Sequence, residues 1–309
     1  MDDATRRDAA APKRAAVEGW SRSCVSMIER PIIIVSSPRS GSTLLFETLS
    51  CSPELWTVGG ESHRVIEGVP SLHPRARRWK SNRLGAAAAD PATVRTVRRR
   101  FHAALRDRNG RRPPRPAEGL RLLEKTPRNA LRIPFLRRVF PRATFVYLHR
   151  EPHETMSSML DGWRSSRYVS YPRLPGWQGL PWSFLLVPRW RALAPDDLGA
   201  IVSHQWATTT SILLGDLARI PAEQRHVVLY ADLVANPREV IGTLCRRLEI
   251  RWDTQIGLSL PQSATTLDPP ARDKWRRNAH ELQPMLEAVT TVAAHAALFT
   301  HEARDDRLN

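Results

Sequence analysis

Cysteine is scarce in this chain, and its three cysteines, Cys24, Cys51 and Cys245, are scattered. An odd number without regular spacing supports neither a disulfide framework nor a zinc site. Long hydrophobic runs are also lacking. No segment approaches the roughly 18 consecutive apolar residues of a membrane span, and no apolar stretch follows the N-terminal charges as in a signal peptide. We therefore expect a cytoplasmic protein without a membrane span.

Lysine is rare although the chain is strongly basic. Of the 47 Lys and Arg residues only four are Lys, and the formal net charge is +16. So strong a preference for Arg indicates a compositional bias of the source genome. The aromatic and glycine patterns of RNA-binding modules are missing, as is a helix-turn-helix pattern. The charge favours anionic partners, and a basic nucleic-acid-binding protein stays only as an alternative.

Length and composition allow one large domain. With 309 residues, 41% of them hydrophobic, an α/β domain can form a substantial core. We expect a flexible lead-in over residues 1–30 and a single domain over 31–300. Within it we expect an Arg-rich helical insert over about 72–118 and a loop with four tryptophans over about 163–190. Strand-like runs alternate with helix-like segments, which favours a mostly parallel sheet flanked by helices.

The most informative segment is an apolar run, residues 32–35, that leads into a turn and a helix-like segment. The turn carries an Arg, a Gly and three hydroxyl side chains, namely Arg39, Ser40, Gly41, Ser42 and Thr43. A strand-to-helix turn directs free N–H groups and the positive end of the helix dipole at one point, which suits a phosphate or sulfate. Glycine permits close backbone approach, and Arg adds a forked donor. An ordinary helix N-cap is the alternative.

Two further segments place polar side chains after strand-like runs. Residues 144–148 are followed by Arg150 and, eight positions later, by Ser158 on an expected helix, a pair that suits a second phosphate. A second apolar run precedes Lys125, one of the four lysines, which favours a need for a compact point charge there. The alternatives are a surface Arg, a helix-face Ser and chance retention of a lysine.

His149 and His153 have the i, i+4 spacing of a metal-binding pair. No third ligand accompanies them, and the helix that begins there is expected to face a phosphate. We therefore expect no metal site.

In this order along the chain, the three segments resemble the sulfotransferases that use 3′-phosphoadenosine 5′-phosphosulfate (PAPS), and most closely the bacterial branch related to tyrosylprotein sulfotransferases. The resemblance covers about residues 31–280. It implies a P-loop-like three-layer α/β fold with a central, mostly parallel sheet. It also implies that residues 38–43 hold the 5′-phosphosulfate and that Arg150 and Ser158 hold the 3′-phosphate.

Two later segments strengthen the resemblance. Residues 230–233 (Tyr-Ala-Asp-Leu) are similar to the family's Tyr-x-Asp-Leu segment, so Tyr230 would lie near the adenine. Residues 274–278 (Lys-Trp-Arg-Arg-Asn) are similar to a late loop that closes over the nucleotide, which assigns Lys274 and Trp275 to the cofactor. Five motifs in the right order are strong evidence.

Two departures from the family pattern matter. Many cytosolic members have Lys where Arg39 stands, and a Trp where this chain has Leu44. Arg is what the tyrosylprotein branch shows, so this substitution sorts the chain into that branch. The missing Trp leaves adenine stacking unassigned.

The resemblance also implies a reaction, in which a sulfuryl group passes from PAPS to an acceptor hydroxyl without a metal. Residues 59–61 resemble the Gly-Glu segment that supplies an acidic base, which makes Glu61 the first choice. His63 competes, because imidazole has a suitable pKa for base catalysis, and an exposed loop residue is its alternative. Arg39 and Lys125 would stabilise the charge that develops on the sulfuryl group.

The acceptor stays open at this point. A secondary metabolite, a lipid, a glycan and an acyl chain bound to a carrier protein all carry suitable hydroxyls, and the sulfate would be kept in the product or would serve as a leaving group. The tryptophan-rich loop over 163–190 is expected to form the acceptor wall, with a packed hydrophobic cluster as its alternative. Oligomeric state is not indicated.

A P-loop kinase is the main alternative enzyme. It would show Gly-x-x-x-x-Gly-Lys-Ser/Thr, whereas here the first Gly is missing and Arg39 precedes Gly41.

Overall fold

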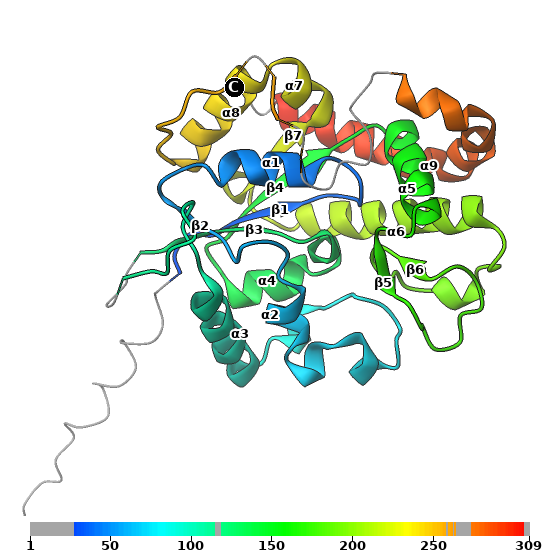
Figure 1. Cartoon of the computed structure of the whole chain (residues 1–309), viewed down its shortest axis with the longest axis horizontal. Helices are drawn as coiled ribbons and strands as arrows, with labels where there is room; N and C mark the ends of the chain where they lie inside the picture. The colour runs from blue at the N-terminus through cyan, green and yellow to red at the C-terminus, as the bar shows by residue number, and fades with distance from the viewer. Residues whose placement is uncertain (1–27, 115–118, 258, 262, 264–272, 306–309) are drawn as a thin grey trace, which may run out of the picture.

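Five short strands form one sheet in the order β2-β3-β1-β4-β7, and every neighbouring pair is parallel (Figure 1). The computed structural model describes residues 28–114, 119–257, 259–261, 263 and 273–305. The strands are β1 (Ile32–Val35), β2 (Leu55–Trp56), β3 (Arg121–Lys125), β4 (Thr144–His149) and β7 (Arg225–Leu229). The expected α/β fold with a parallel central sheet is confirmed.

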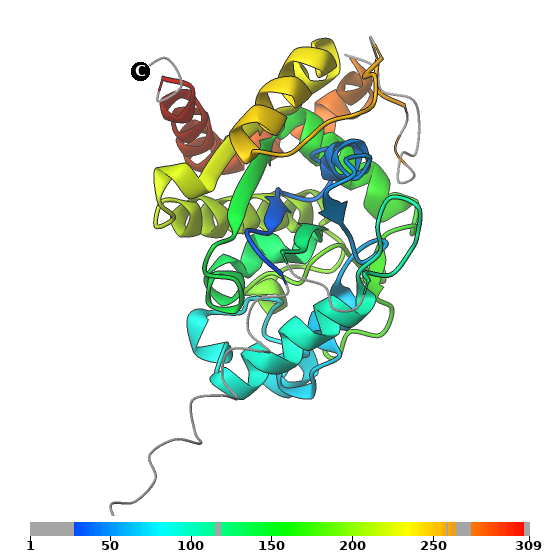
Figure 2. The ribbon, with the colours of Figure 1, turned by 90° about the vertical axis from the view of Figure 1, so that its left-hand side faces the viewer.

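Helices cover both faces of this sheet, which gives three layers. On one face lie α1 (Ser42–Leu49), α7 (Tyr230–Ala235) and α8 (Pro237–Leu248). On the other lie α3 (Pro91–Ala104), α4 (Ile133–Val139), the C-terminal half of α6 (Leu198–Leu217) and that of α9 (Ala279–Asp305). Figure 2 shows α3 and α8 on opposite sides of the strands.

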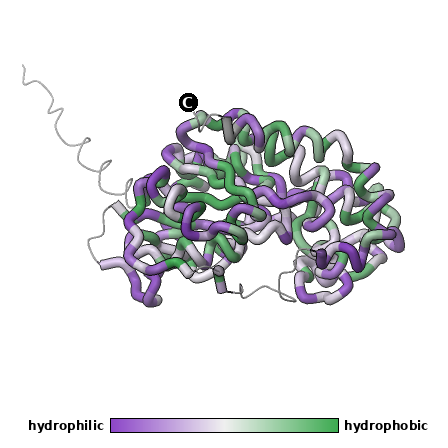
Figure 3. Tube along the Cα trace, turned by 90° about the horizontal axis from the view of Figure 1, so that it is seen from above, coloured by the Kyte–Doolittle hydropathy of each residue, from purple (hydrophilic) through white to green (hydrophobic). Residues whose placement is uncertain are grey.

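Strand β1 is apolar along its whole length because both faces of the sheet are covered. Ile32 and Ile34 of β1 point into the core under α1 and α8, whereas Ile33 and Val35 point into the opposite core. The strands accordingly form a hydrophobic centre when the chain is coloured by hydropathy (Figure 3). No helix in the described part of the chain combines the length and the apolar character needed to cross a membrane.

A second core lies beside the sheet, at the right in Figure 1. It is built by α5 (Pro152–Arg164), the antiparallel pair β5 (Val169–Tyr171) and β6 (Trp182–Ser183), and the N-terminal halves of α6 and α9. Trp163, Trp182 and Trp190 are almost completely buried at its centre. Their rings meet edge to face, with 5.4 Å between the centroids of Trp163 and Trp182.

The remaining helical segments are short. They are α2 (His63–Glu67), η1 (Pro70–Leu72), η2 (Pro74–Arg77), η3 (Ala86–Ala88), η4 (Pro127–Leu131), η5 (Trp190–Ala192), η6 (Ala222–Gln224) and η7 (Lys274–Asn278). Within the Arg-rich segment 72–118, Val97 and Phe101 of α3 are fully buried, so this helix is part of the main core. Residues 1–27 of the expected lead-in and 115–118 of the insert lie outside the described residues.

Candidate active site

The turn between β1 and α1 has the backbone expected of an anion cradle. Arg39 and Gly41 both adopt left-handed conformations, with φ of 66° and 93°. Gly41 occupies the N-cap of α1 and has no side chain to satisfy the N–H groups of the first turn, which stay available to a ligand. A Cβ atom on Gly41 would lie 2.5 Å from the Tyr230 ring, so the turn and the start of α7 fit together only with glycine here.

A first cluster of reactive side chains joins this turn to the end of β3. The Lys125 ammonium donates to Glu61 Oε1 at 2.9 Å and to Thr43 Oγ1 at 3.2 Å. On the other side of the carboxylate, His63 Nε2 lies 2.6 Å from Glu61 Oε2. The Lys125 side chain is buried, whereas about a third of the Glu61 and His63 side chains is exposed. The cluster is therefore open to solvent from the Glu61–His63 side.

Charge in this cluster is set by the contacts of Glu61. Burial by itself would raise the pKa of Glu61, but the hydrogen bond from His63 and the nearby Lys125 charge outweigh it and lower the pKa to about 2. Burial lowers the pKa of His63, although Glu61 opposes the shift. An ionised carboxylate only accepts hydrogen bonds, so His63 Nε2 carries the proton and Nδ1 keeps a lone pair. Nδ1 has no hydrogen-bond partner among the described residues.

A second cluster lies between the turn, β4 and α5. Arg39 Nε donates to Ser158 Oγ at 3.2 Å, and Arg150 Nη1 donates to the Arg39 carbonyl at 3.1 Å. The Arg150 guanidinium lies 4.5 Å from the Tyr230 ring centroid, and that of Arg39 lies 4.3 Å from the ring of Tyr168. Two guanidinium groups and a hydroxyl thus lie close together beside two tyrosine rings, which suits an anion attached to a nucleobase.

The late segment η7 is attached to the same helix that carries Ser158. The Trp275 ring meets that of His153 edge to face, with 4.8 Å between centroids. Asn278 Nδ2 donates to Ser157 Oγ at 2.9 Å and to Asp161 Oδ1 at 3.2 Å. Lys274 and Trp275 are thereby held next to the N-terminal half of α5.

The family follows from a comparison of the sequence with family models. The model described as the sulfotransferase family matches residues 31–254, which is most of the chain. The chain belongs to the sulfotransferase family. The family that the sequence motifs predict is thus confirmed, and the kinase and nucleic-acid-binding alternatives lose their support.

One curated relative shows only a distant similarity to this chain. Protein-tyrosine sulfotransferase A of Caenorhabditis elegans is 24% identical over 230 residues, which cover 73% of this chain and 51% of that protein. The chain thus spans about half the length of that curated relative.

Solved structures with a similar fold include a sulfotransferase domain from the Synechococcus PCC 7002 olefin synthase. It is 20% identical, with a TM-score of 0.48, over 87% of this chain and 96% of that one. A sulfotransferase domain from the curacin biosynthetic pathway is 19% identical, with a TM-score of 0.41, over 82% and 97% of the two chains.

The structure gathers the residues that the sulfotransferase motifs single out. They follow the carboxyl ends of β1, β3 and β4, or belong to segments that pack there, and this edge of a parallel sheet is where ligands bind in such folds. The turn residues 38–43 connect the two clusters, since Thr43 contacts Lys125 and Arg39 contacts Ser158. The roles of these side chains in binding and catalysis stay predictions.

Some residues of the site were not singled out from the sequence. Tyr168 belongs to no motif that would predict its position over the Arg39 guanidinium. Ser62 and Glu124 stand inside two of the motifs, next to Glu61 and Lys125, yet only their tertiary contacts give them weight: Ser62 Oγ donates to Glu124 Oε1 at 2.6 Å.

The tryptophan-rich loop differs from the expected acceptor wall in one respect. Trp163, Trp182 and Trp190 are buried in the second core, so in this conformation their rings do not face an acceptor. Trp177 is half-buried, and Leu180 is 49% exposed. The acceptor-side role of the loop stays a prediction, which now depends on its exposed side chains.

His149 and His153, which have the spacing of a metal-binding pair, each contact another aromatic side chain. His149 Nδ1 lies 3.0 Å from the Tyr147 hydroxyl, and His153 packs against Trp275. Within the described ranges, no group of three or more His, Cys, Asp or Glu side chains is arranged to hold a metal ion.

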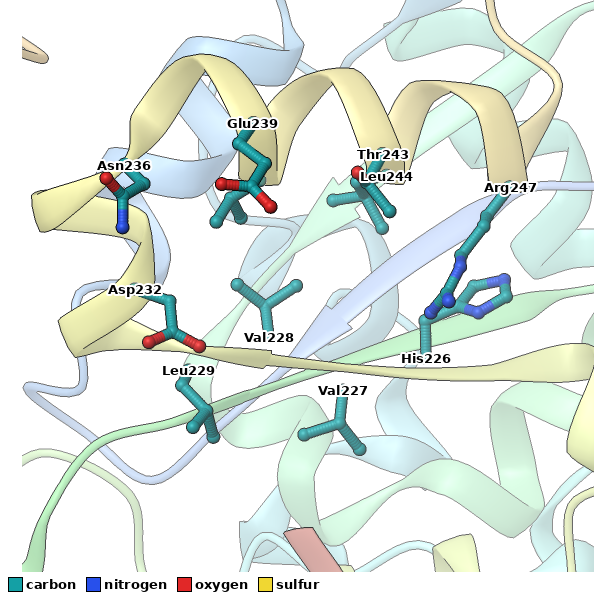
Figure 4. Close-up of a pocket in the computed structure, with 11 residues that line it drawn as sticks. His226, Val227, Val228, Leu229, Asp232, Asn236, Glu239, Thr243, Leu244 and Arg247 are labelled. Atoms are coloured by element: carbon teal, nitrogen blue, oxygen red, sulfur yellow. The ribbon is translucent and has the colours of Figure 1, made fainter. Parts of the chain in front are cut away.

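A cavity of about 330 Å³ lies at the edge strand β7, under α7 and α8 (Figure 4). Asp232, Asn236 and Glu239 line one end of it, and His226 and Arg247 the other. β1 and β4 separate this strand from β3. The cavity is therefore distinct from the Lys125 cluster.

Proposed function

We propose that this sulfotransferase transfers a sulfuryl group from PAPS to the hydroxyl of an acceptor. The observation that carries the proposal is the position of Lys125, whose ammonium contacts both the anion-binding turn at Thr43 and the carboxylate of Glu61. One cation thus lies between a site for the donor's anionic group and a candidate base for the acceptor. Family membership supports this assignment.

The nucleotide would bind across the two clusters. Ser40, Ser42 and Thr43, with the N–H groups of the first turn of α1, suit the 5′-phosphosulfate. Arg150 and Ser158 suit the 3′-phosphate, and Tyr230, which packs on Gly41, suits the adenine. Lys274 and Trp275 would cover the nucleotide from η7. Fixed cations and N–H groups supply the positive charge, so we propose that no metal takes part.

In the proposed transfer, the acceptor oxygen forms a bond to sulfur while the bond from sulfur to the bridging phosphate oxygen breaks. Glu61 takes the acceptor proton, and adenosine 3′,5′-bisphosphate leaves. Lys125 and Arg39 stabilise the developing negative charge. An anion beside Lys125 would also weaken its hold on Glu61 and raise the pKa of that carboxyl, which makes Glu61 a stronger base when the donor is bound.

His63 is the second candidate base, because it contacts Glu61 and an imidazole can accept a proton near neutral pH. Separate Glu61→Gln and His63→Gln variants distinguish the two. If Glu61 is the base, Glu61→Gln abolishes turnover, and His63→Gln lowers kcat less. An equal or larger loss in His63→Gln would make the imidazole the base.

The acceptor is proposed only as a class of hydroxyl compounds, which includes small metabolites, lipids, glycans and acyl chains on a carrier protein. Incubation with sulfur-labelled PAPS and fractionated extracts of the host would label it. Analysis of the product would show whether the sulfate stays or departs.

The proposal is tested first by binding and then by transfer. Adenosine 3′,5′-bisphosphate should bind in the presence of a metal chelator, as measured by calorimetry. In the labelled-PAPS assay, Lys125→Ala should lower the rate by about 10²–10³, the effect of removing one charge-stabilising donor. Magnesium-dependent ATP turnover, or near-normal transfer by Lys125→Ala, would contradict the assignment.

A further inference from the structure

A buried hydrogen-bonded network lies next to the Glu61–His63 pair and has no part in the transfer described above. Ser62, the residue between the two, is completely buried. Its hydroxyl donates to Glu124 Oε1 at 2.6 Å, and its backbone N–H donates to Thr126 Oγ1 at 2.7 Å. Both contacts tie the start of α2 to the end of β3.

Glu124 and Lys125 hold this segment from the two faces of the sheet. Successive side chains of a strand point in opposite directions, and Leu122 and Leu123 accordingly belong to the cores on opposite faces. Lys125 binds Glu61 from the face that α1 covers, and Glu124 binds Ser62 from the other face. The Glu61–His63 pair is thus fixed through its side chain and through its backbone.

Burial of the Glu124 carboxyl at this position is unfavourable for the stability of the fold. Glu124 is 1% exposed, and its Oε1 also accepts from Asn129 Nδ2 at 3.0 Å. Its Oε2 is buried without a hydrogen-bond partner among the described residues. Burial raises the pKa of Glu124 to about 7, although the hydrogen bond from Ser62 and the nearby Lys125 charge oppose the shift. A buried polar atom without a partner destabilises the fold, so an apolar side chain would serve packing better.

We propose that Glu124 is a positioning residue for sulfuryl transfer. Through the Ser62 hydroxyl it sets where α2 begins, and therefore where the Glu61 and His63 side chains lie relative to Lys125. The inference rests on the function proposed above. Reacting groups must be held within about 0.5 Å of a productive geometry, and a carboxyl that is rigidly buried provides such a fixed point.

Four variants separate positioning from packing. Glu124→Leu removes the acceptor of the Ser62 hydroxyl at similar size, and Ser62→Ala removes the donor with minimal change in volume. Glu124→Gln keeps an oxygen acceptor and is the conservative rescue. Leu122→Ala is the matched control, because it damages the same face of β3 without touching Ser62. Thermal unfolding of all four shows how much stability each one loses.

The first readout needs neither donor nor acceptor. The imidazole of His63 titrates in an NMR experiment, assigned with His63→Gln. In the wild type, the pKa of His63 should lie below its ordinary value of 6.5, because the ring is buried. In Glu124→Leu and Ser62→Ala it should move toward 6.5 as the ring is released. Glu124→Gln and Leu122→Ala should retain the wild-type value.

The second readout is the labelled-PAPS assay with the host extract as acceptor source. Glu124→Leu and Ser62→Ala should lower kcat by about 10²-fold, the typical effect of a misplacement of about 1 Å. KM for PAPS, and the affinity for adenosine 3′,5′-bisphosphate, should stay within about twofold, because β1, β4 and α5 supply most of that site. Glu124→Gln should recover most of the wild-type kcat.

These outcomes decide whether Glu124 positions the Glu61–His63 pair or only contributes to packing. An unchanged His63 titration in both Glu124→Leu and Ser62→Ala would overturn the inference, as would an equal loss of kcat in Leu122→Ala. If Glu124→Leu does not fold, Ser62→Ala decides alone. A wild type that does not bind adenosine 3′,5′-bisphosphate would overturn the proposed function, whereas the His63 titration would still report on positioning.

Discussion

At the scale of single residues, the pKa of Glu61 depends on the two side chains that contact its carboxylate. The carboxylate lies between an ammonium and an imidazole, and these two contacts reverse the effect of burial on its pKa. The hydrogen bond from His63 and the charge and hydrogen bond of Lys125 all lower this pKa, and the Lys125 side chain is buried. Removal of that charge should therefore change the titration of Glu61.

We predict that the free energy of unfolding of Lys125→Met varies less with pH in the acidic range than that of the wild type. A Glu61 pKa of about 2, against an ordinary value of 4.5, stabilises the folded protein above pH 4.5, and this contribution is lost as the pH falls through about 2. Without Lys125, burial is opposed only by the contact with His63, so the pKa of Glu61 rises toward its ordinary value and the contribution becomes smaller. The difference in free energy of unfolding between wild type and variant should shrink as the pH falls from about 5 to 2, measured by urea titration. Lys80→Met, at an exposed lysine, is the control, and parallel curves for Lys125→Met and wild type would refute the assignment.

At the scale of elements, the site depends on how closely the β1–α1 turn approaches α7. The Tyr230 ring at the start of α7 fills the space where a side chain on Gly41 would lie. The same ring receives the guanidinium of Arg150 from the end of β4. The β1–α1 turn, the end of β4 and the start of α7 thus meet at one aromatic ring.

Gly41→Ala should therefore disturb both stability and nucleotide binding. The added Cβ meets the Tyr230 ring at 2.5 Å, and the positive φ of 93° strains any L side chain. We expect a loss of about 1–3 kcal/mol in the free energy of unfolding and at least a tenfold loss of affinity for adenosine 3′,5′-bisphosphate. The matched control is Gly110→Ala, at φ of 77° with open space around it, which should lose stability but no affinity. Equal affinities for the two variants would contradict the close contact.

At the scale of the whole molecule, buried ion pairs join the main core to the second one. Glu67 at the end of α2 pairs with Arg128 and Arg132 after β3, and Arg132 is fully buried. Asn82 donates to Glu67 and also to the Tyr171 hydroxyl of β5, at 2.6 Å. The network connects the segment with the candidate base to the tryptophan-rich core.

Glu67→Gln should destabilise the protein by about 3–5 kcal/mol, because it leaves buried guanidinium charge without a counter-ion. Urea unfolding measures the loss. Glu249→Gln is the control: Glu249 forms a 2.8 Å pair with Arg30 at the surface, and such pairs contribute about 0–1 kcal/mol. If Glu67→Gln loses no more free energy of unfolding than Glu249→Gln, the buried pairs of Glu67 contribute no more to stability than a surface pair.

Several elements could be predicted because their signals are local. The apolar run expected over residues 32–35 is β1, and the strand-like run 144–148 before Arg150 lies in β4. The long helix α9 was missed, although Leu282, Met285 and Val289 repeat at helical spacing along its buried side. The sequence left open whether the tryptophans are buried in a core or exposed to an acceptor, because their spacing does not show which way the rings point.

By itself, the sequence determined the strand–turn–helix unit that begins at Ile32, the family and the parallel α/β sheet, since each rests on neighbouring residues or on the order of short motifs. Only the tertiary structure decided which groups act together. Lys125 and Glu61 are 64 residues apart, as are Ser62 and Thr126. Their contacts arise because parallel strands deliver distant segments to one edge of the sheet. The pKa of Glu61 and the burial of Glu124 depend on that meeting, so no local pattern could reveal them.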